Sequence, residues 1–324
     1  MKAALPSIYP VRSVDWDKWI LDRRPQRLTL DPWRPYAFSM EDECSISGEV
    51  VPVATTFLTN RECPWRCLMC DLWRNTLTGE VPAGAIPAQI DYALARLSPA
   101  RQIKLYNSGS FFDPRAIPVS DYPAIASRLN CFDRVIVESH PALLGERCLR
   151  LRDLVKGRLE VAMGLETVHP ETLRRLNKRM TLEQFSTAAA WLLRNEIDLR
   201  VFILVKPPFM EEEEALHWAE RSLDFAFDCG AIAASLIPTR AGNGALDELA
   251  ARGEFSAPRM ETLEAAAEYG LGLKRGRIFA DLWNLEQVSG CNACRGSHVS
   301  RLREMNLRQA IPPPVICVAC GDGK

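Results

Sequence analysis

Six times after residue 50, the chain passes from a short run of β-branched or apolar residues into a helical pattern. We predict strands at the apolar runs, which occupy residues 53–60, 102–110, 134–139, 159–167, 199–209 and 231–240. Strands and helices in alternation indicate a parallel sheet with right-handed crossovers. A complete barrel of this kind has eight units, and we find no clear seventh or eighth strand after residue 240. The sequence therefore predicts an α/β protein with a partial (β/α)6 barrel similar to a TIM barrel.

The predicted barrel occupies only the middle of the 324-residue chain, so we divide the chain into three parts. They are an N-terminal arm (1–50), the barrel (51–275) and a C-terminal cysteine-rich extension (276–324). The arm is rich in proline, tryptophan and arginine and has no clean periodicity. We expect it to be irregular and to pack on the barrel through Trp16, Trp19 and Trp33.

Charge and hydropathy exclude some functions. The net charge of −1 gives no general positive field for nucleic acid, although a local basic patch would suffice for RNA. The chain has no run near the roughly 20 apolar residues of a membrane span, and its N-terminus has prolines and charges where a signal peptide needs an apolar run. We therefore expect a cytoplasmic protein with no membrane contact. In a reducing compartment, its eleven cysteines favour metal ligands or free thiols over disulfides.

The segment "RECPWRCLMC" (61–70) places Cys63, Cys67 and Cys70 directly after the first predicted strand. Ligands of parallel barrels gather at the C-terminal ends of the strands, so this loop is expected on the catalytic face. Three thiolates can ligate three irons of a 4Fe–4S cube and leave the fourth iron without a protein ligand. The alternative is a zinc site that another cysteine completes.

This CxxxCxxC segment, together with the order of strands and helices around it, resembles the radical S-adenosylmethionine (SAM) superfamily over roughly residues 50 to 270. One difference is Met69, which stands where the superfamily usually has an aromatic residue. Within the superfamily, the chain is similar to archaeosine-synthase-type radical SAM proteins of the elongator and methylthiotransferase-like group. The segments that carry this similarity are "KLYNSGSFFDPRAIP", "VIVESHP", "VAMGLET", "LNKRMTLEQF" and "ILVKPPFMEEEEA".

The resemblance implies an enzyme in which a reduced 4Fe–4S cluster cleaves SAM to methionine and a 5′-deoxyadenosyl radical. That radical would abstract hydrogen from a substrate, and a flavodoxin or ferredoxin type of protein would donate the electron. The archaeosine-type proteins imply a modified tRNA nucleoside as substrate and a partner protein that prepares it. Two alternatives stay open: radical chemistry on a small metabolite, and a non-catalytic zinc protein.

The superfamily binds the methionine end of SAM with a glycine-rich segment after the second strand. Here that segment lacks the usual glutamate but keeps a glycine and small polar groups. Polar residues also end the third and fourth strands, and Glu166 among them is a candidate for catalytic proton transfer, although such carboxylates are often merely exposed. Two basic residues are candidates for the SAM carboxylate or a substrate anion. The expected cofactor contacts are Asn107, Ser108, Gly109, Ser110, Glu138, Ser139, Glu166, Arg179 and Lys206.

The C-terminal extension contains two CxxC pairs, Cys291/Cys294 and Cys317/Cys320, with 22 residues between them. Four thiolates from two such pairs are a strong indication of a metal site, and zinc is the usual occupant. A second 4Fe–4S cluster is the alternative, and His298 could replace one thiolate.

The stretch "LRRLNKR" (173–179) is compact and basic, so it is a candidate for contact with RNA phosphates. The alternative is an ordinary exposed helix face.

Overall fold

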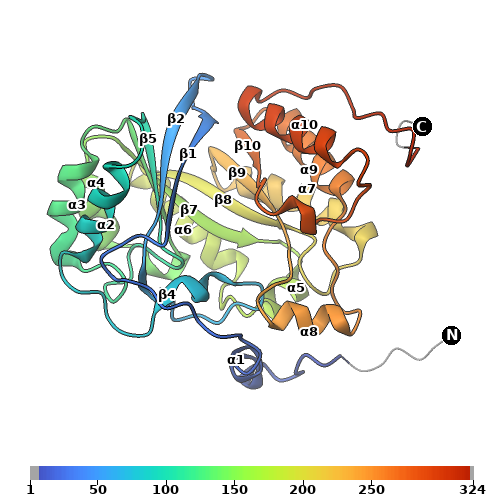
Figure 1. The fold of residues 1–324 in the computed structure, drawn as a ribbon, viewed down its shortest axis with the longest axis horizontal. Helices are drawn as coiled ribbons and strands as arrows, with labels where there is room; N and C mark the ends of the chain where they lie inside the picture. The colour runs from blue at the N-terminus through green and yellow to red at the C-terminus, as the bar shows by residue number, and fades with distance from the viewer. Residues whose placement is uncertain (1–6, 322–324) are drawn as a thin grey trace.

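The computed structural model describes residues 7–321, and its core is a curled sheet of eight strands that forms a half-barrel (Figure 1). Their order in the sheet is β1-β2-β5-β6-β7-β8-β9-β10. All neighbours from β2 to β10 are parallel, whereas β1 runs antiparallel to β2. The strands are β1 (Ala37–Cys44), β2 (Val50–Phe57), β5 (Gln102–Tyr106), β6 (Arg134–Glu138), β7 (Arg158–Glu166), β8 (Asp198–Val205), β9 (Ala233–Pro238) and β10 (Arg277–Ala280).

The six predicted strands are present as β2 and β5 to β9, and the partial barrel is confirmed. Two further strands were missed. The N-terminal segment expected to be irregular contains β1, which pairs with β2 along its whole length. The other missed strand, β10, is a seventh parallel strand of only four residues. Both strands carry charged residues on their inner face, so neither has the apolar pattern that the sequence analysis relied on.

Helices cover the outer face of the sheet (Figure 1). In α6 a capping box from Thr181 and Gln184 fixes the start, and the acidic first turn of α7 complements the helix dipole. No helix within residues 7–321 is long and apolar enough to cross a membrane. The outer helices are α2 (Ala85–Leu94), α3 (Tyr122–Leu129), α4 (Glu146–Leu154), α6 (Leu182–Arg194), α7 (Glu212–Asp228), α9 (Met260–Leu273) and α10 (Arg295–Arg308).

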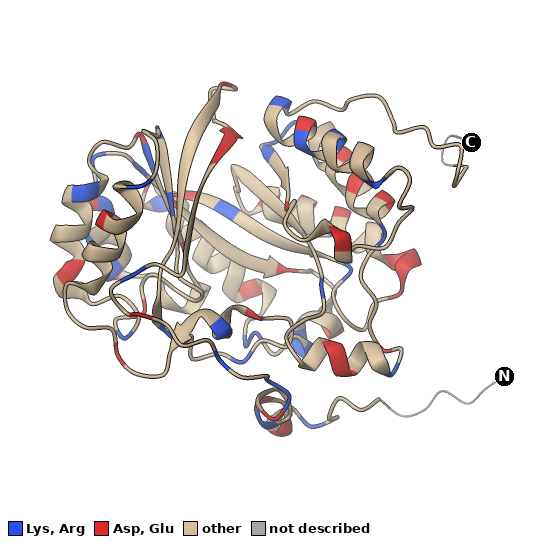
Figure 2. Cartoon of the chain, viewed as in Figure 1, with Lys and Arg blue, Asp and Glu red and all other residues tan. Residues whose placement is uncertain are grey.

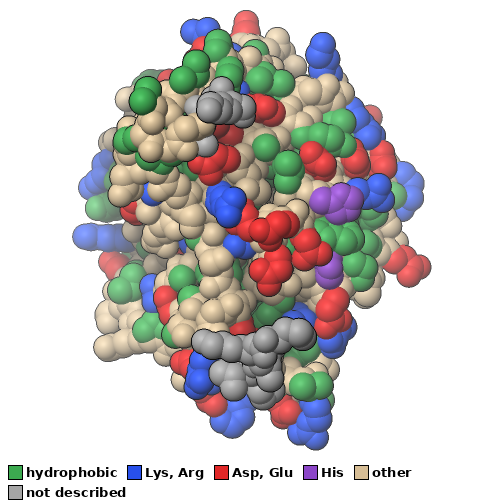
Figure 3. All heavy atoms as spheres, turned by 90° about the vertical axis from the view of Figure 1, so that its right-hand side faces the viewer, with side chains coloured by type: hydrophobic (Ala, Val, Ile, Leu, Met, Phe, Trp, Pro, Cys, Tyr) green, Lys and Arg blue, Asp and Glu red, His purple; other side chains and the backbone are tan. Residues whose placement is uncertain are grey.

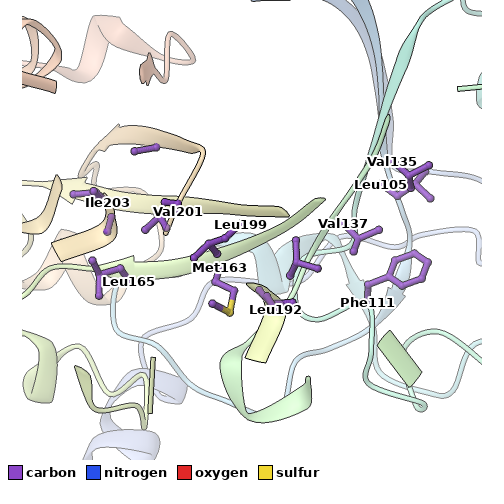
Figure 4. Packing of buried hydrophobic residues seen from close by; sticks show 14 of the residues in the cluster. Leu105, Phe111, Val135, Val137, Met163, Leu165, Leu192, Leu199, Val201 and Ile203 are labelled. Carbon is purple, nitrogen blue, oxygen red and sulfur yellow. The ribbon is translucent and has the colours of Figure 1, made fainter. Parts of the chain in front are cut away.

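The apolar core lies between the sheet and these helices. Side chains alternate between the two faces of each strand, and the outward set is apolar. Figure 4 shows Val137 of β6, Met163 of β7 and Leu199 of β8 packed against Leu192 of α6. Burying each such side chain stabilises the fold by about 1.5–3 kcal/mol. Because the apolar core lies outside the sheet, the inward-facing strand positions can carry polar side chains.

Charged side chains fill the interior of the half-barrel near the N-terminal ends of the strands. Arg200 of β8 is only 2% exposed and donates to Glu160 of β7 (2.6 Å) and to Glu43 of β1. Lys104 of β5 lies 2.5 Å from Glu43, and Arg134 of β6 donates to Glu160 (2.9 Å). Removing one member would leave a buried charge unpaired, at a cost of about 3–5 kcal/mol. The network closes this end of the barrel, so a reactive site belongs at the opposite end.

The N-terminal arm packs against that opposite end. Its helix α1 (Trp16–Leu21) buries Trp16 and Trp19 in a second apolar cluster, as predicted. The same cluster contains Leu68 of the cysteine segment and Leu246 of α8 (Ala245–Ala251). Trp33 is 48% exposed, so the prediction that it packs on the barrel is wrong for this residue.

Candidate functional site

The three clustered cysteines lie in a loop that a short sheet closes at its base. Strand β3 (Asn60–Arg61) pairs in parallel with β4 (Thr76–Leu77), and the loop between them ends in the short helix η2 (Leu72–Asn75). Because β3 follows directly on β2, the loop stands at the C-terminal end of the half-barrel, where the sequence placed it. We call residues 62–75 the cysteine loop.

Hydrogen bonds between the backbone of the cysteine loop and distant segments hold the loop in place. The side-chain amide of Asn177, in the segment after β7, donates to the carbonyl of Arg66 (2.8 Å). The carbonyl of the preceding residue, Leu176, accepts from the Leu68 amide (2.9 Å). Asn243, which follows β9, donates to the carbonyl of Leu68 (2.7 Å). These contacts fix the position of the loop relative to the segments that follow β7 and β9.

An aromatic contact adds a fourth attachment. Trp65 stacks on His140, which follows β6, with ring centroids 3.7 Å apart. The Nδ1 atom of His140 accepts from the Ala142 amide, so its Nε2 carries the proton and donates to the carbonyl of Lys178 (3.1 Å). Burial, together with the nearby Lys178 ammonium, lowers the pKa of His140 to about 4. This histidine is a neutral support for the loop.

The side chains of Cys63, Cys67 and Cys70 are partly buried in the cysteine loop. Burial raises the pKa of each thiol to about 12. Their mutual repulsion as thiolates raises the values further, whereas Lys178 opposes the rise for Cys63 and Cys67. Without a metal these groups hold their protons, and a metal ion would have to displace them on binding.

The segment after β5 lies directly against the cysteine loop. A Cβ atom built on Gly109 would be 3.3 Å from Cβ of Cys63, so glycine permits this close approach. Glu138, at the end of β6, accepts from the backbone amides of Asn107 (2.5 Å) and Gly109 (3.3 Å). Burial raises the pKa of Glu138 to about 7, and these amides oppose the rise. Glu138 thus shapes the segment that the sequence analysis predicted to bind cofactor.

Within that segment, Asn107 carries an unsatisfied amide. Its side chain is fully buried, and neither Oδ1 nor Nδ2 has a hydrogen-bond partner among residues 7–321. Leaving a buried polar group unpaired costs about 1–3 kcal/mol, a cost that a hydrogen bond to a ligand would recover. Ser108 Oγ lies 3.1 Å from the hydroxyl of Tyr36, and Ser110 Oγ lies 2.8 Å from Ser139 Oγ.

Glu166 ends β7 and forms a buried ion pair with Lys178 (2.5 Å). The pair lies over Gly164, where a Cβ atom would overlap the Glu166 carboxylate and come within 2.5 Å of Lys178 Nζ. Glu166 has a left-handed backbone (φ +67°), and the pairing of β7 with β8 shifts at this point. Strained backbone of this kind is concentrated at functional sites. The pair brings a positive charge to the edge of the thiol group.

The two cations that the sequence analysis predicted, Arg179 and Lys206, already have protein partners. Arg179 is half exposed and pairs with Asp17 of the arm (3.2 Å). Lys206 is buried, lies 3.0 Å from Glu212 and donates to Ser256 Oγ (2.7 Å). The basic stretch 173–179 is largely neutralised, since Arg174 also pairs with Glu171.

The four C-terminal cysteines come together at the start of α10. Their sulfur atoms all lie within 4.8 Å of one another, which can hold a metal ion. Cys294 precedes α10 and Cys320 follows it, and their sulfur atoms are 3.8 Å apart. Figure 1 shows the last segment running back along α10 to reach this point. His298 lies against Glu264 (3.0 Å) and outside the sulfur group, so it does not replace a thiolate.

No protein-family model matches the chain. It is 26% identical over 238 residues to an uncharacterized protein of Methanocaldococcus jannaschii, covering 69% of this chain and 65% of that protein. It is 27% identical over 196 residues to the archaeosine synthase subunit beta of Methanosarcina acetivorans, covering 56% of each. The chain thus matches less than two thirds of the length of either relative.

Two solved structures share the fold. The Elp3 protein of Methanocaldococcus infernus superposes with a TM-score of 0.51 at 13% identity, over 73% of this chain and 60% of that one. Methylornithine synthase (PylB) superposes with a TM-score of 0.54 at 14% identity, over 78% and 70%. Both are radical SAM enzymes. The chain has the fold of the radical SAM enzymes.

The residues at the end of the half-barrel fit the 4Fe–4S cluster and the SAM that enzymes of the radical SAM fold carry. One closed loop presents three thiols and no fourth, and the unsatisfied Asn107 amide lies in the segment packed on it. This donor set is the one that leaves one iron of a cube without a protein ligand.

Sequence reasoning missed four residues that shape this site: Tyr36, Asn177, Lys178 and Asn243. The first lies in a segment without periodicity, and the last in a segment that reads as an ordinary loop. Lys178 was visible only as one charge in a basic stretch. Asn177 has a left-handed backbone (φ +56°), a conformation that asparagine tolerates. The sequence around Asn177 gives no sign of that conformation.

Proposed function

We propose that the chain cleaves SAM reductively at a 4Fe–4S cluster and abstracts hydrogen from a modified nucleoside of tRNA. The observation that carries this proposal is the cysteine loop, which presents three partly buried thiols at the C-terminal end of a half-barrel with the radical SAM fold. The named relative, an archaeosine synthase subunit, supports tRNA as the substrate and a second protein that prepares it.

Cys63, Cys67 and Cys70 would hold the cluster. When bound, the cluster passes an electron from a flavodoxin or ferredoxin type of donor to SAM, which splits into methionine and a 5′-deoxyadenosyl radical. The protein contributes the closed loop, which keeps the three thiols together, and the packing that keeps water out.

Four residues are placed to hold the methionine end of SAM. The Asn107 amide can accept from the ammonium and donate to the carboxylate, and the Ser108 hydroxyl lies beside it in the chain. Lys178 supplies a positive charge for the carboxylate, and Glu166 orients its ammonium group. Glu138 has a supporting part, because its carboxylate already accepts from the backbone that carries Asn107.

The C-terminal four-cysteine group we assign to one zinc ion. Four thiolates complete a tetrahedral shell and leave no open position, which is typical of structural zinc. Bound zinc would tie the last segment to the start of α10. A second 4Fe–4S cluster is the rival occupant, and metal analysis of the purified protein separates the two.

The test is a single-turnover assay with dithionite-reduced, anaerobically reconstituted protein, in which 5′-deoxyadenosine and methionine are quantified. We expect cleavage with the wild type and none with Cys67→Ala. Cys131→Ala, which removes an exposed cysteine, is the matched control and should cleave SAM normally. Equal cleavage by the Cys67 variant would refute the proposal.

A further inference from the structure

Three arginines gather around the indole of Trp73, which lies in the cysteine loop. The guanidinium carbons of Arg24, Arg27 and Arg74 lie 4.7, 6.0 and 5.7 Å from the ring centroid of Trp73. Arg66 joins them through Glu62, the residue before Cys63 (3.2 Å). We call Arg24, Arg27, Arg66 and Arg74 the arginine cluster.

The arginine cluster is not neutralised by the protein. Within residues 7–321, Glu62 is the only carboxylate with which its members pair, and it contacts Arg24 (2.7 Å), Arg27 and Arg66. Arg74 forms no ion pair with any residue in the described range. Four positive charges against one negative charge leave a local excess of three. The partial burial of Arg24 and Arg27, whose side chains are 8% and 23% exposed, makes this excess costly in the absence of an anion.

The same place has hydrogen-bond donors without acceptors. The indole Nε1 of Trp73 and the Nε atoms of Arg24 and Arg74 are buried and have no partner within residues 7–321. Trp73 is only 4% exposed. All three groups donate and none accepts, so any partner that reached them would have to be a hydrogen-bond acceptor. A phosphate group meets that requirement and the charge excess together.

The position of the arginine cluster suits a substrate with a phosphate backbone. Two of its members, Arg66 and Arg74, lie in the cysteine loop itself, and Arg24 and Arg27 come from the N-terminal arm. Figure 2 shows basic residues along the N-terminal arm and beside β4. The face on the right of Figure 1 has the opposite charge. Figure 3 views this face directly and shows acidic side chains gathered at its centre. RNA would avoid that acidic face.

We propose that the arginine cluster and Trp73 Nε1 bind a backbone phosphate of the RNA whose nucleoside enters the site. This inference rests on the proposed function for the presence of RNA, and it specifies where the RNA is held. Arg27 has the smaller part, because its guanidinium already donates to Glu62 and to Thr76 (2.6 Å). Arg74 contributes most to phosphate binding, because its guanidinium forms no ion pair within residues 7–321. Phosphate contacts fix the position of a nucleic acid and do not read its sequence.

The experiment measures anaerobic binding of labelled tRNA to the reconstituted protein over a range of salt concentrations. Arg74→Gln is expected to weaken binding about tenfold and to reduce the slope of log affinity against log salt by about one. Arg74→Lys should keep most of the slope, because it keeps the charge. The matched control is Arg303→Gln, which removes an exposed arginine of α10 on another part of the molecule. It should leave both quantities unchanged.

Several results would overturn the inference. One is tRNA binding by Arg74→Gln with the affinity and salt slope of the wild type. Another is an equal loss for Arg303→Gln, which would indicate a diffuse charge effect. A shift in the reduction potential of the cluster with unchanged tRNA binding would assign the arginines to the cluster. If the wild type cleaves SAM but binds no tRNA at low salt, the RNA part of the proposed function fails as well. If Arg74→Gln does not fold, Arg74→Lys and a second variant, Arg27→Gln, provide the comparison.

Discussion

The two cysteine groups of this chain differ in what holds them together. The cysteine loop is closed by a small sheet and attached to segments that follow β6, β7 and β9. The C-terminal group joins residues before and after α10, and the last segment has exposed side chains at Ile316 (79%) and Val318 (100%). The first group is organised by the protein and provides an incomplete set of ligands. The second provides a complete set of four, and we propose that a bound metal keeps its last segment in order.

Removing one cysteine from each group in turn gives the sharpest test of this difference. Cys63→Ala should abolish SAM cleavage, because the cluster loses one of its three protein ligands. Cys317→Ala should leave cleavage close to that of the wild type, since its thiol serves only the C-terminal site. Product analysis after anaerobic reduction gives both numbers. Loss of cleavage in the Cys317 variant would show that the two groups act together.

Removing the zinc should affect the C-terminal segment alone. With its four ligands free, the last segment has few apolar contacts to keep it in place, so a chelator or Cys294→Ala should open it to protease. We expect cleavage after residue 309 within minutes, while the rest of the chain stays intact. Mass spectrometry of the fragments locates the cut. A segment that stays protected after zinc is lost would show that packing holds it.

Lys178 tests whether the first group has a built-in cofactor contact. Lys178→Met leaves the Glu166 carboxylate buried and unpaired, so the free energy of unfolding should fall by about 3–5 kcal/mol. The double variant with Glu166→Gln removes the unpaired charge and should recover most of that loss. SAM affinity, measured by equilibrium dialysis with reconstituted protein, should stay low in both. Normal SAM binding by the double variant would make the pair purely structural.

A smaller effect follows from His140, which supports the cysteine loop as a neutral ring. Its pKa of about 4 lies below the usual 6.5, so the unfolded chain binds the proton more tightly. Stability is therefore lost as the pH falls from about 6.5 towards 4. Between pH 7 and pH 5 the wild type should lose about 2 kcal/mol more than His140→Phe, which keeps the stacking on Trp65.

Urea titrations at the two pH values give this difference. The His140→Phe variant should start about 1 kcal/mol less stable at pH 7, because it loses the bond to the Lys178 carbonyl. Equal pH dependence in the two proteins would show that His140 is not held in the neutral form.

Much of the fold was accessible from the sequence, because the outward faces of β2 and β5 to β9 are apolar and alternate with helices. Strand β1 was missed because Glu41 and Glu43 face inward and pair with Lys104, a partner about 60 residues away. The two cysteine groups were visible because their spacing alone specifies the chemistry.

The remainder of the site depends on long-range contacts that the sequence does not display. Arg179 and Lys206 were as plausible as Lys178 by position. Only the structure reveals that Lys178 lies near the thiols of Cys63 and Cys67, whereas Arg179 pairs with Asp17 and Lys206 with Glu212. The same reason explains the basic stretch 173–179, which looked like the RNA contact. Arg74, which has no ion pair within residues 7–321, lies instead in η2, and no run of basic residues around it predicted an RNA contact.

The metal content of the anaerobically reconstituted protein tests the central claim most directly. Wild type is compared with the triple alanine variant of Cys63, Cys67 and Cys70. We predict about four irons, four sulfides and one zinc per wild-type chain, and one zinc without iron in the variant. No iron in the wild type, or the same iron in both proteins, would contradict the claim that the cysteine loop holds a SAM-cleaving cluster.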